Sequence, residues 1–247
     1  MIAGHFTRLL GPTVLAASAL SAFPLVAEPR ASASPCPDVQ VLFARGTDEA
    51  PGLGRTGQAF VNSLRPRLGG QSMQVYPVNY PASHQWSTGI DGIRDAGNHI
   101  QTTAANCPRT KIVLGGYSQG AAVMGFVTSA AVPDGVDPAT VPKPLAPEVA
   151  DRVNAVVLFG TPNTRAMNFL GEPQIVIGPT FTAKTIKVCA PEDPVCSDGM
   201  NFAAHDGYND AVINQGADFA AGRVNGVPLP PPPAPGVPPP PPVNFGS

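Results

Sequence analysis

Residues 111–124 read Lys-Ile-Val-Leu-Gly-Gly-Tyr-Ser-Gln-Gly-Ala-Ala-Val-Met, and this stretch decides the fold class. It begins as a short β-branched apolar run and ends as an Ala-rich segment typical of a helix, with a Gly-x-Ser-x-Gly pattern from Gly116 to Gly120 between them. A serine at a strand-to-helix junction of this kind sits on a sharp turn, and small flanking residues let the two backbones approach. The stretch predicts an α/β fold in which Ser118 projects a nucleophilic hydroxyl. The alternative is a serine that only caps the following helix.

Short apolar runs, bounded by Gly and Pro, recur along the chain and alternate with segments of helical spacing. Strands of this composition are covered on both faces, which is typical of a parallel sheet. The pattern predicts a three-layer α/β sandwich with a central, mostly parallel sheet of about five strands and a ligand site at their carboxyl ends. The expected strands are Val39–Ala44, Met73–Val78, Lys111–Gly115, Asn154–Phe159 and Lys184–Cys189.

Composition excludes several classes of partner and divides the chain into three parts. Charged residues make up 13% of the 247 positions and the net charge is −2, so there is no basic field for nucleic acid or an anionic membrane. Residues 1–33 resemble a signal peptide, with an apolar run and an Ala-Ser-Ala pattern ending at Ala33; the alternative is a membrane anchor. Residues 34–226 form the expected catalytic domain. We expect an exported monomer with no integral membrane span after processing.

The segment 227–247 holds 11 prolines in 21 positions. It cannot form a backbone hydrogen-bond ladder and has little to bury, so we expect an extended, disordered tail outside the core. The tail is either a spacer, a ligand for an envelope component, or a segment without function.

Four cysteines remain after the predicted cleavage site: Cys36, Cys107, Cys189 and Cys196. An even number in an exported protein favours two disulfides, and of the three possible pairings we favour Cys36 with Cys107 and Cys189 with Cys196. A metal site is the alternative, but the chain has no Cys-x-x-Cys and its four histidines show no paired spacing. We therefore expect no metal and no organic cofactor.

A serine hydroxyl needs a base to take its proton, and in this sheet type the chain order is Ser, then Asp or Glu, then His. His205 is the only histidine after Ser118, so it is the predicted base. Asp193 lies after the last predicted strand, inside the segment from Cys189 to Cys196, where a short disulfide loop would hold it rigidly. Asp193 is the predicted acid. The open alternatives are Glu192, Asp198 and Asp206.

The oxyanion of an attacked carbonyl needs hydrogen-bond donors. One expected donor is the backbone N–H of Gln119, directly after the nucleophile. The second should come from the loop after the first strand, where Thr47 offers an amide and a hydroxyl. The alternative is that Thr47 is a simple turn residue.

The ordered combination of motifs resembles the cutinase-like family of secreted serine esterases. The motifs are Ala-Arg-Gly-Thr at 44–47, Gly-Gly-Tyr-Ser-Gln-Gly-Ala at 115–121, Leu-Phe-Gly at 158–160, and the Cys189–Cys196 loop followed by His205. The resemblance implies Ser118, Asp193 and His205 as nucleophile, acid and base, Thr47 and Gln119 as oxyanion donors, and the two favoured disulfides. Thr47 departs from the serine usual in fungal members but keeps the hydroxyl, and the proline-rich tail is not part of the family pattern.

The resemblance also implies a minimal α/β-hydrolase-like fold without a long lid. In such enzymes the acyl chain lies between two loops, which here are residues 81–87 with Trp86 and 200–204 with Phe202. The expected activity is hydrolysis of short- to medium-chain carboxylic or lipid esters. The alternatives are an acetyl esterase acting on polysaccharide and a catalytically idle, exported envelope-binding protein.

Overall fold

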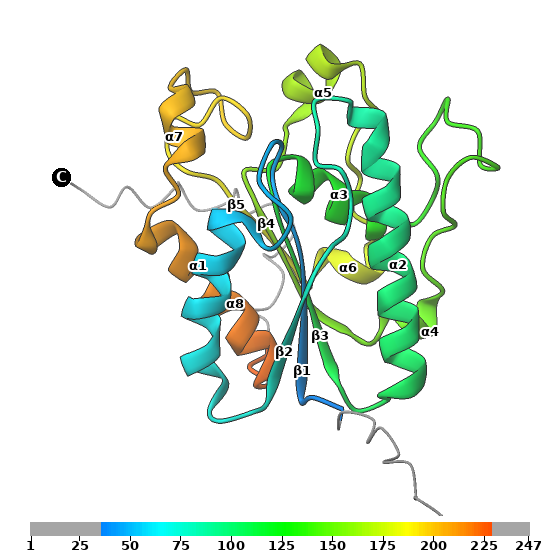
Figure 1. Ribbon diagram of the computed structural model, residues 1–247, viewed down its shortest axis with the longest axis vertical. Helices are drawn as coiled ribbons and strands as arrows, with labels where there is room; N and C mark the ends of the chain where they lie inside the picture. The colour runs from blue at the N-terminus through cyan, green and yellow to red at the C-terminus, as the bar shows by residue number, and fades with distance from the viewer. Residues whose placement is uncertain (1–35, 229–247) are drawn as a thin grey trace, which may run out of the picture. The chain divides into compact units, whose positions relative to one another are not determined.

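Five parallel strands form the centre of the structure, a computed structural model that describes residues 36–228 (Figure 1). The strand order is β2-β1-β3-β4-β5, and each neighbouring pair is parallel. The predicted α/β sheet is therefore confirmed. The strands are β1 (Val39–Ala44), β2 (Met73–Pro77), β3 (Lys111–Tyr117), β4 (Val153–Phe159) and β5 (Thr185–Val188).

The period-2 alternation of side chains along the strands builds two separate cores. In β1, Val39, Val41 and Phe43 face one cluster of buried apolar side chains, and Leu42 and Ala44 face another. All six residues of this strand are buried, because helices cover both faces of the sheet. The continuous apolar run in the sequence is thus explained by a strand that has no solvent-facing side.

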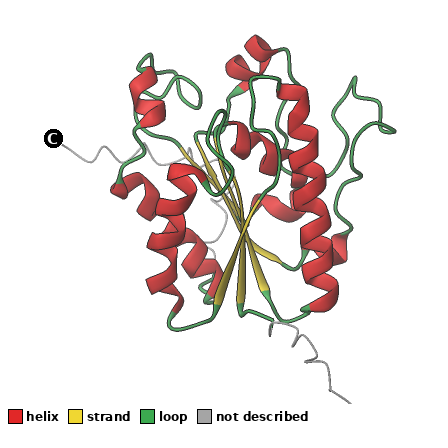
Figure 2. Cartoon of the chain, in the orientation of Figure 1, coloured by secondary structure: helices red, strands yellow, loops and turns green. Residues whose placement is uncertain are grey.

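Helices cover the sheet as two layers (Figures 1 and 2). The first core is closed by α1 and α8, and the second by α2 and α3. The longer helices are α1 (Gly54–Leu64), α2 (Gly89–Asn106), α3 (Gln119–Val127) and α8 (Asp210–Val224). The shorter ones are η1 (Arg65–Leu68), η2 (Trp86–Thr88), α4 (Pro147–Ala150), α5 (Thr164–Leu170), α6 (Pro179–Thr182) and α7 (Phe202–Asp206).

Two disulfides join the four cysteines in the pairings that the sequence favours. Cys36 is bonded to Cys107, which ties the start of β1 to the end of α2, and Cys189 is bonded to Cys196. Because such bonds persist in oxidising compartments, they are consistent with an extracellular protein. The predicted signal peptide, and the tail from residue 229 onward, lie outside the described residues.

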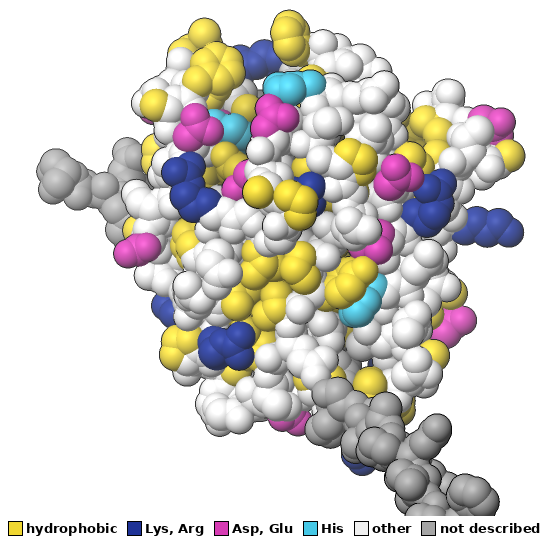
Figure 3. Space-filling view, viewed as in Figure 1, with side chains coloured by type: hydrophobic (Ala, Val, Ile, Leu, Met, Phe, Trp, Pro, Cys, Tyr) yellow, Lys and Arg dark blue, Asp and Glu magenta, His cyan; other side chains and the backbone are white. Residues whose placement is uncertain are grey.

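On the face seen in Figure 3, basic side chains are dispersed among acidic ones. Among residues 36–228, none of the helices combines the length and the apolar character that crossing a bilayer requires.

Candidate active site

The turn between β3 and α3 places Ser118 at the carboxyl edge of the sheet. Ser118 has φ 54° and ψ −118°, a left-handed conformation that costs energy for a residue with a Cβ. The Ser118 N–H donates to the carbonyl of Phe159 on β4, at 2.9 Å, which holds the turn in place. A Cβ on Gly120 would lie 2.0 Å from the Ala44 carbonyl oxygen. The turn can therefore pack against β1 only because position 120 is glycine.

Three predicted residues meet at this edge in a continuous chain of hydrogen bonds. His205 Nε2 lies 2.8 Å from Ser118 Oγ, and His205 Nδ1 lies 2.8 Å from Asp193 Oδ2. An ionised carboxylate can only accept, so Nδ1 carries the proton and Nε2 is free to accept the serine hydroxyl proton. The three residues come from three different segments: the β3–α3 turn, the loop after β5, and α7.

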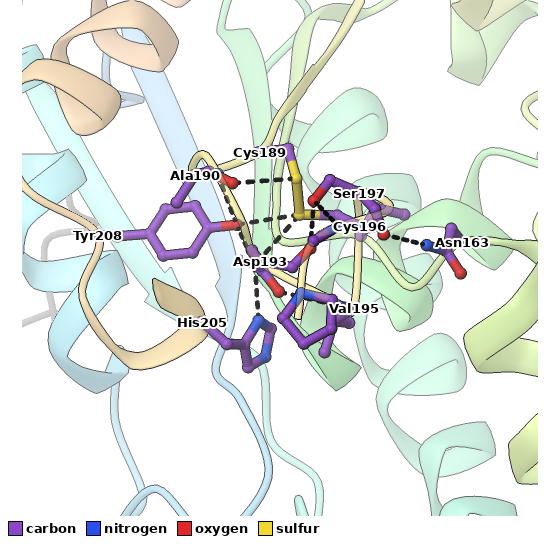
Figure 4. Close-up of a disulfide and its surroundings, with 12 residues drawn as sticks. Asn163, Cys189, Ala190, Asp193, Val195, Cys196, Ser197, His205 and Tyr208 are labelled. Carbon is purple, nitrogen blue, oxygen red and sulfur yellow. Dashed lines mark hydrogen bonds and ion pairs between the residues drawn. A yellow bond between two sulfur atoms is a disulfide. The ribbon is translucent and has the colours of Figure 1, made fainter. Parts of the chain in front are cut away.

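Asp193 is fully buried, in the short loop closed by the Cys189–Cys196 disulfide (Figure 4). Its Oδ1 accepts the Val195 N–H at 2.9 Å, and its Oδ2 accepts the Tyr208 hydroxyl at 2.9 Å as well as the imidazole N–H. Burial opposes ionisation of Asp193, but the hydrogen bonds from His205, Val195 and Tyr208 outweigh it, so its pKa lies below its ordinary value. The carboxylate is thus held charged beside the imidazole.

Two tyrosines that the sequence analysis did not assign complete the support of the histidine. The Tyr117 hydroxyl donates to the backbone carbonyl of His205 at 2.7 Å, and its ring stacks on the imidazole at a centroid distance of 5.2 Å. Burial, with the nearby Asp193 charge, raises the pKa of Tyr208 well above its ordinary value, so this hydroxyl stays a donor. Only the position of Tyr117, next to Ser118, hinted at such a role.

Gly160 makes room for this arrangement. It has φ 58°, and a Cβ there would lie 2.8 Å from the Tyr208 hydroxyl and 3.0 Å from His205 Cε1. The glycine that ends the Leu-Phe-Gly motif thus borders the imidazole directly.

The loop after β1 lies against the β3–α3 turn and is held by hydrogen bonds. The Arg45 guanidinium donates to the backbone carbonyls of Tyr80 and Glu49, each at 2.7 Å. The Glu49 carboxylate accepts the backbone N–H groups of Gly46 and Arg55, at 2.7 and 2.8 Å. Thr47 is half-buried in the turn between these anchors. A Cβ on Gly46 would touch the ring of Tyr117, so this loop lies against the residue that precedes Ser118.

The Gln119 side chain is almost completely buried, at 1% exposure. Its Nε2 donates to the Ser83 carbonyl at 2.8 Å, which fixes the orientation of the amide. Its Oε1 is the one buried side-chain nitrogen or oxygen atom that has no hydrogen-bond partner within the described part of the chain.

The loop residues predicted to bind substrate are placed differently from one another. Trp86, in η2, lines a groove of about 930 Å³ together with Gln119. Phe202, on α7, is 70% exposed and is not among the residues that line this groove. The structure therefore brings Trp86, but not Phe202, into one groove with Gln119, the residue after Ser118.

Comparison with known proteins identifies the family of this chain. The family model described as cutinase matches residues 35–224. The chain belongs to the cutinase family. A relative named as the probable carboxylesterase Culp5 of Mycobacterium tuberculosis is 56% identical over 172 residues, which is 69% of this chain and 98% of the relative.

Solved structures agree with the family assignment. A cutinase of Trichoderma reesei in complex with a phosphonate inhibitor is 32% identical, with a TM-score of 0.56 over 77% of this chain and 78% of that one. An acetylxylan esterase is 27% identical, with a TM-score of 0.62 over 76% of this chain and 99% of that one. The overall fold described above is thus shared with solved esterases.

One group in the cutinase-family site has the residue types of a metal site. Ligand atoms of Cys189, Asp193 and Cys196 lie within 4.8 Å of one another. The two sulfurs are joined in a disulfide, however, and a metal ligand must be a thiolate. This donor set therefore does not fit a metal ion.

Proposed function

We propose that this chain hydrolyses carboxylic esters with apolar acyl groups through an acyl-enzyme formed on Ser118. As a member of the cutinase family, it is a cutinase-like ester hydrolase of the serine type. The observation that carries the residue roles is the hydrogen-bonded chain from Ser118 through His205 to Asp193, with both contacts at 2.8 Å. A serine aligned with a base, which is in turn oriented by a buried acid, is the arrangement that activates a hydroxyl for attack.

In the first half of the reaction, Ser118 Oγ attacks the ester carbonyl while His205 Nε2 takes the hydroxyl proton. The buried Asp193 carboxylate stabilises the imidazolium that forms. Negative charge develops on the carbonyl oxygen, and the Gln119 N–H and Thr47 are the proposed donors to it. His205 then gives its proton to the departing alcohol, leaving the acyl group on Ser118.

The second half repeats these roles with water. His205 takes a proton from the water as the water attacks the acyl-enzyme, and it returns this proton to Ser118 as the acid product leaves.

The nucleophile is tested by Ser118→Ala. The rate on p-nitrophenyl butyrate should fall by about 10⁴ to 10⁶, and labelling by an organofluorophosphonate probe should disappear, because only an activated serine reacts. Circular dichroism and thermal unfolding serve as controls for folding. A Ser118→Ala protein that hydrolysed the ester near the wild-type rate would refute the mechanism.

A second candidate is an acetyl esterase acting on polysaccharide, because the solved acetylxylan esterase shares the fold over 99% of its length. The two functions differ in chain-length preference. Rates that peak at acetate and require a sugar alcohol would favour this second function, whereas rates that rise from acetate to butyrate and beyond would favour the first.

We further propose that the chain is exported as a monomer, with cleavage after Ala33, and that the segment 227–247 contacts an envelope component rather than substrate. The two disulfides support export. Deletion of residues 229–247 should leave esterase activity unchanged while reducing the share of protein in the envelope fraction. Mass spectrometry of the mature N-terminus tests cleavage after Ala33, and size-exclusion chromatography tests the monomeric state.

A further inference from the structure

A large groove runs beside the catalytic edge on the side of the sheet covered by α2 and α3. Its volume is about 930 Å³, near the upper end of the roughly 300–1,000 Å³ typical of ligand pockets. Helix α2 forms one wall and α3 forms the floor. The outer wall is the segment 131–146, a loop that lies beside α2 in Figure 1. A pocket of this size is more than a short acyl group needs.

The groove is mainly apolar where these three elements face one another. Half-buried aliphatic and aromatic side chains contributed by all three elements line it: Ile90, Ile93, Phe126, Val136, Val141 and Leu145. Polar groups such as Arg94 and Lys143 also line it. An elongated apolar ligand suits such a groove better than a sugar or a peptide, because most of the lining surface is apolar.

One end of the groove meets the catalytic machinery. Gln119, which directly follows Ser118, is one of its lining residues, and so is Trp86. This end therefore lies beside the residue whose backbone N–H is the proposed oxyanion donor, while the rest of the groove is suited to a hydrocarbon chain.

The length of the groove follows from the helix that forms its wall. Its lining residues on α2 extend from Gly89 to Gln101, which is about 18 Å along the axis at a rise of 1.5 Å per residue. Within the described part of the chain, the hydrogen bonds of residues 131–145, which form the outer wall, join these residues only to one another and not to α2.

We infer that this groove binds a long alkyl chain of the ester substrate, which enters past Trp86 and Gln119 and lies between α2 and the segment 131–146. The inference rests on the proposed ester hydrolysis and specifies its substrate class as long-chain esters. It places the alkyl chain in a site formed by α2, α3 and the segment 131–146, and not in the space between residues 81–87 and 200–204.

Gly97 offers a direct way to block the groove. It lines the α2 wall about 12 Å along the helix from Gly89, and a Cβ added there meets no atom within 4 Å. Gly97→Trp would fill the groove beyond the reach of a butyryl group, and Gly97→Ala is the matched control, since it adds only the Cβ and favours the helix.

The experiment compares kcat/KM of the wild type and both variants on p-nitrophenyl butyrate, octanoate, dodecanoate and hexadecanoate. Each methylene buried should improve binding by about fourfold. Gly97→Trp should therefore lose about tenfold or more on the two longest esters, relative to Gly97→Ala, and stay within about twofold on butyrate. An equal ratio of the two variants at every chain length would overturn the inference.

A second variant guards against a misfolded Gly97→Trp protein. Val136 lies half-buried on the outer wall, in a loop, so Val136→Glu places a charge in the groove without disturbing the core. It should also reduce the rate only on long esters, and an unchanged chain-length profile in this variant would count against the groove. If the wild type hydrolysed none of the esters, the proposed function itself would fail, which is a different result from either variant outcome.

Discussion

The hydroxyl of Tyr208 is predicted to hold Asp193, the proposed catalytic acid, in its charged form, and Tyr208→Phe removes this hydroxyl while keeping the ring. The hydroxyl donates to Asp193 Oδ2 at 2.9 Å, and Asp193 is fully buried. A hydrogen bond to a charged group contributes about 1.5–3 kcal/mol, so the free energy of unfolding at pH 7 should fall by about this amount. For a domain of this size the melting temperature should fall by about 3–12 °C.

The loss should depend on pH in a defined direction. The pKa of Asp193 lies below its ordinary value in the folded protein, so the stability contributed by its charge is complete above the unfolded pKa of about 3.9 and is lost as the pH falls through the folded pKa. Removing the Tyr208 donor moves the folded pKa back toward the ordinary value. The stability difference between the wild type and Tyr208→Phe should therefore be largest above about pH 5 and should narrow below it.

The assay is urea unfolding from pH 3 to pH 8, together with kcat on p-nitrophenyl butyrate. If the loss of this hydrogen bond to Asp193 raises the activation free energy by about 1.4 kcal/mol, kcat falls by about tenfold. Tyr76→Phe is the matched control. The Tyr76 hydroxyl, on β2, also donates to a carboxylate, that of Asp95, at 2.9 Å, but this pair lies outside the hydrogen-bonded chain of Ser118, His205 and Asp193. The kcat of this variant should therefore not change. A stability loss in Tyr208→Phe that is equal at every pH would refute the reasoning, since the hydroxyl would not then act through a titrating carboxylate.

Two further changes test the support of the triad. Gly160→Ala should reduce kcat at least about tenfold, because its Cβ would lie 3.0 Å from His205 Cε1. Gly171→Ala is the control: Gly171 also has a positive φ, 69°, but an added Cβ there meets nothing within 4 Å, so this variant should lose stability and keep its kcat. Equal kcat values in the two variants would contradict the prediction. Replacing both Cys189 and Cys196 by alanine should lower the free energy of unfolding by about 2–3 kcal/mol and kcat with it, measured by thermal unfolding and esterase assay, and unchanged values would show that the disulfide does not hold the acid.

The parts of the fold and site that depend on local sequence were predictable. The strands follow from short apolar runs, and the sharp turn at Ser118 follows from Gly-x-Ser-x-Gly at a strand-to-helix junction. His205 follows from chain order alone. The strands and the turn depend on the backbone conformation of a few neighbouring residues, and the choice of histidine was made from only four candidates.

Other features depend on how distant segments return to the sheet, and these could not be predicted. Tyr208 looks like a helix-flanking apolar residue until α7 and α8 bring it against Asp193. The segment 131–146 is rich in proline and has no helical or strand period, so only its position beside α2 reveals that it forms one wall of a groove. For the same reason Trp86 and Phe202, which look alike in the sequence, lie in different environments.

The strand order explains why Thr47 and Ser118, a proposed donor and the proposed nucleophile, leave the sheet at the same edge. The chain passes from β1 outward to β2, then returns to β3 on the other side of β1 and continues to β4 and β5. The helices that follow β1 and β3 pack on opposite faces of the sheet, since α1 belongs to the first core and α3 to the second. The connections leaving these neighbouring strands must therefore diverge, and a crevice opens between them at the carboxyl edge. Thr47 follows β1 and Ser118 follows β3, so the topology puts both residues at the carboxyl edge of neighbouring strands, whatever their side chains.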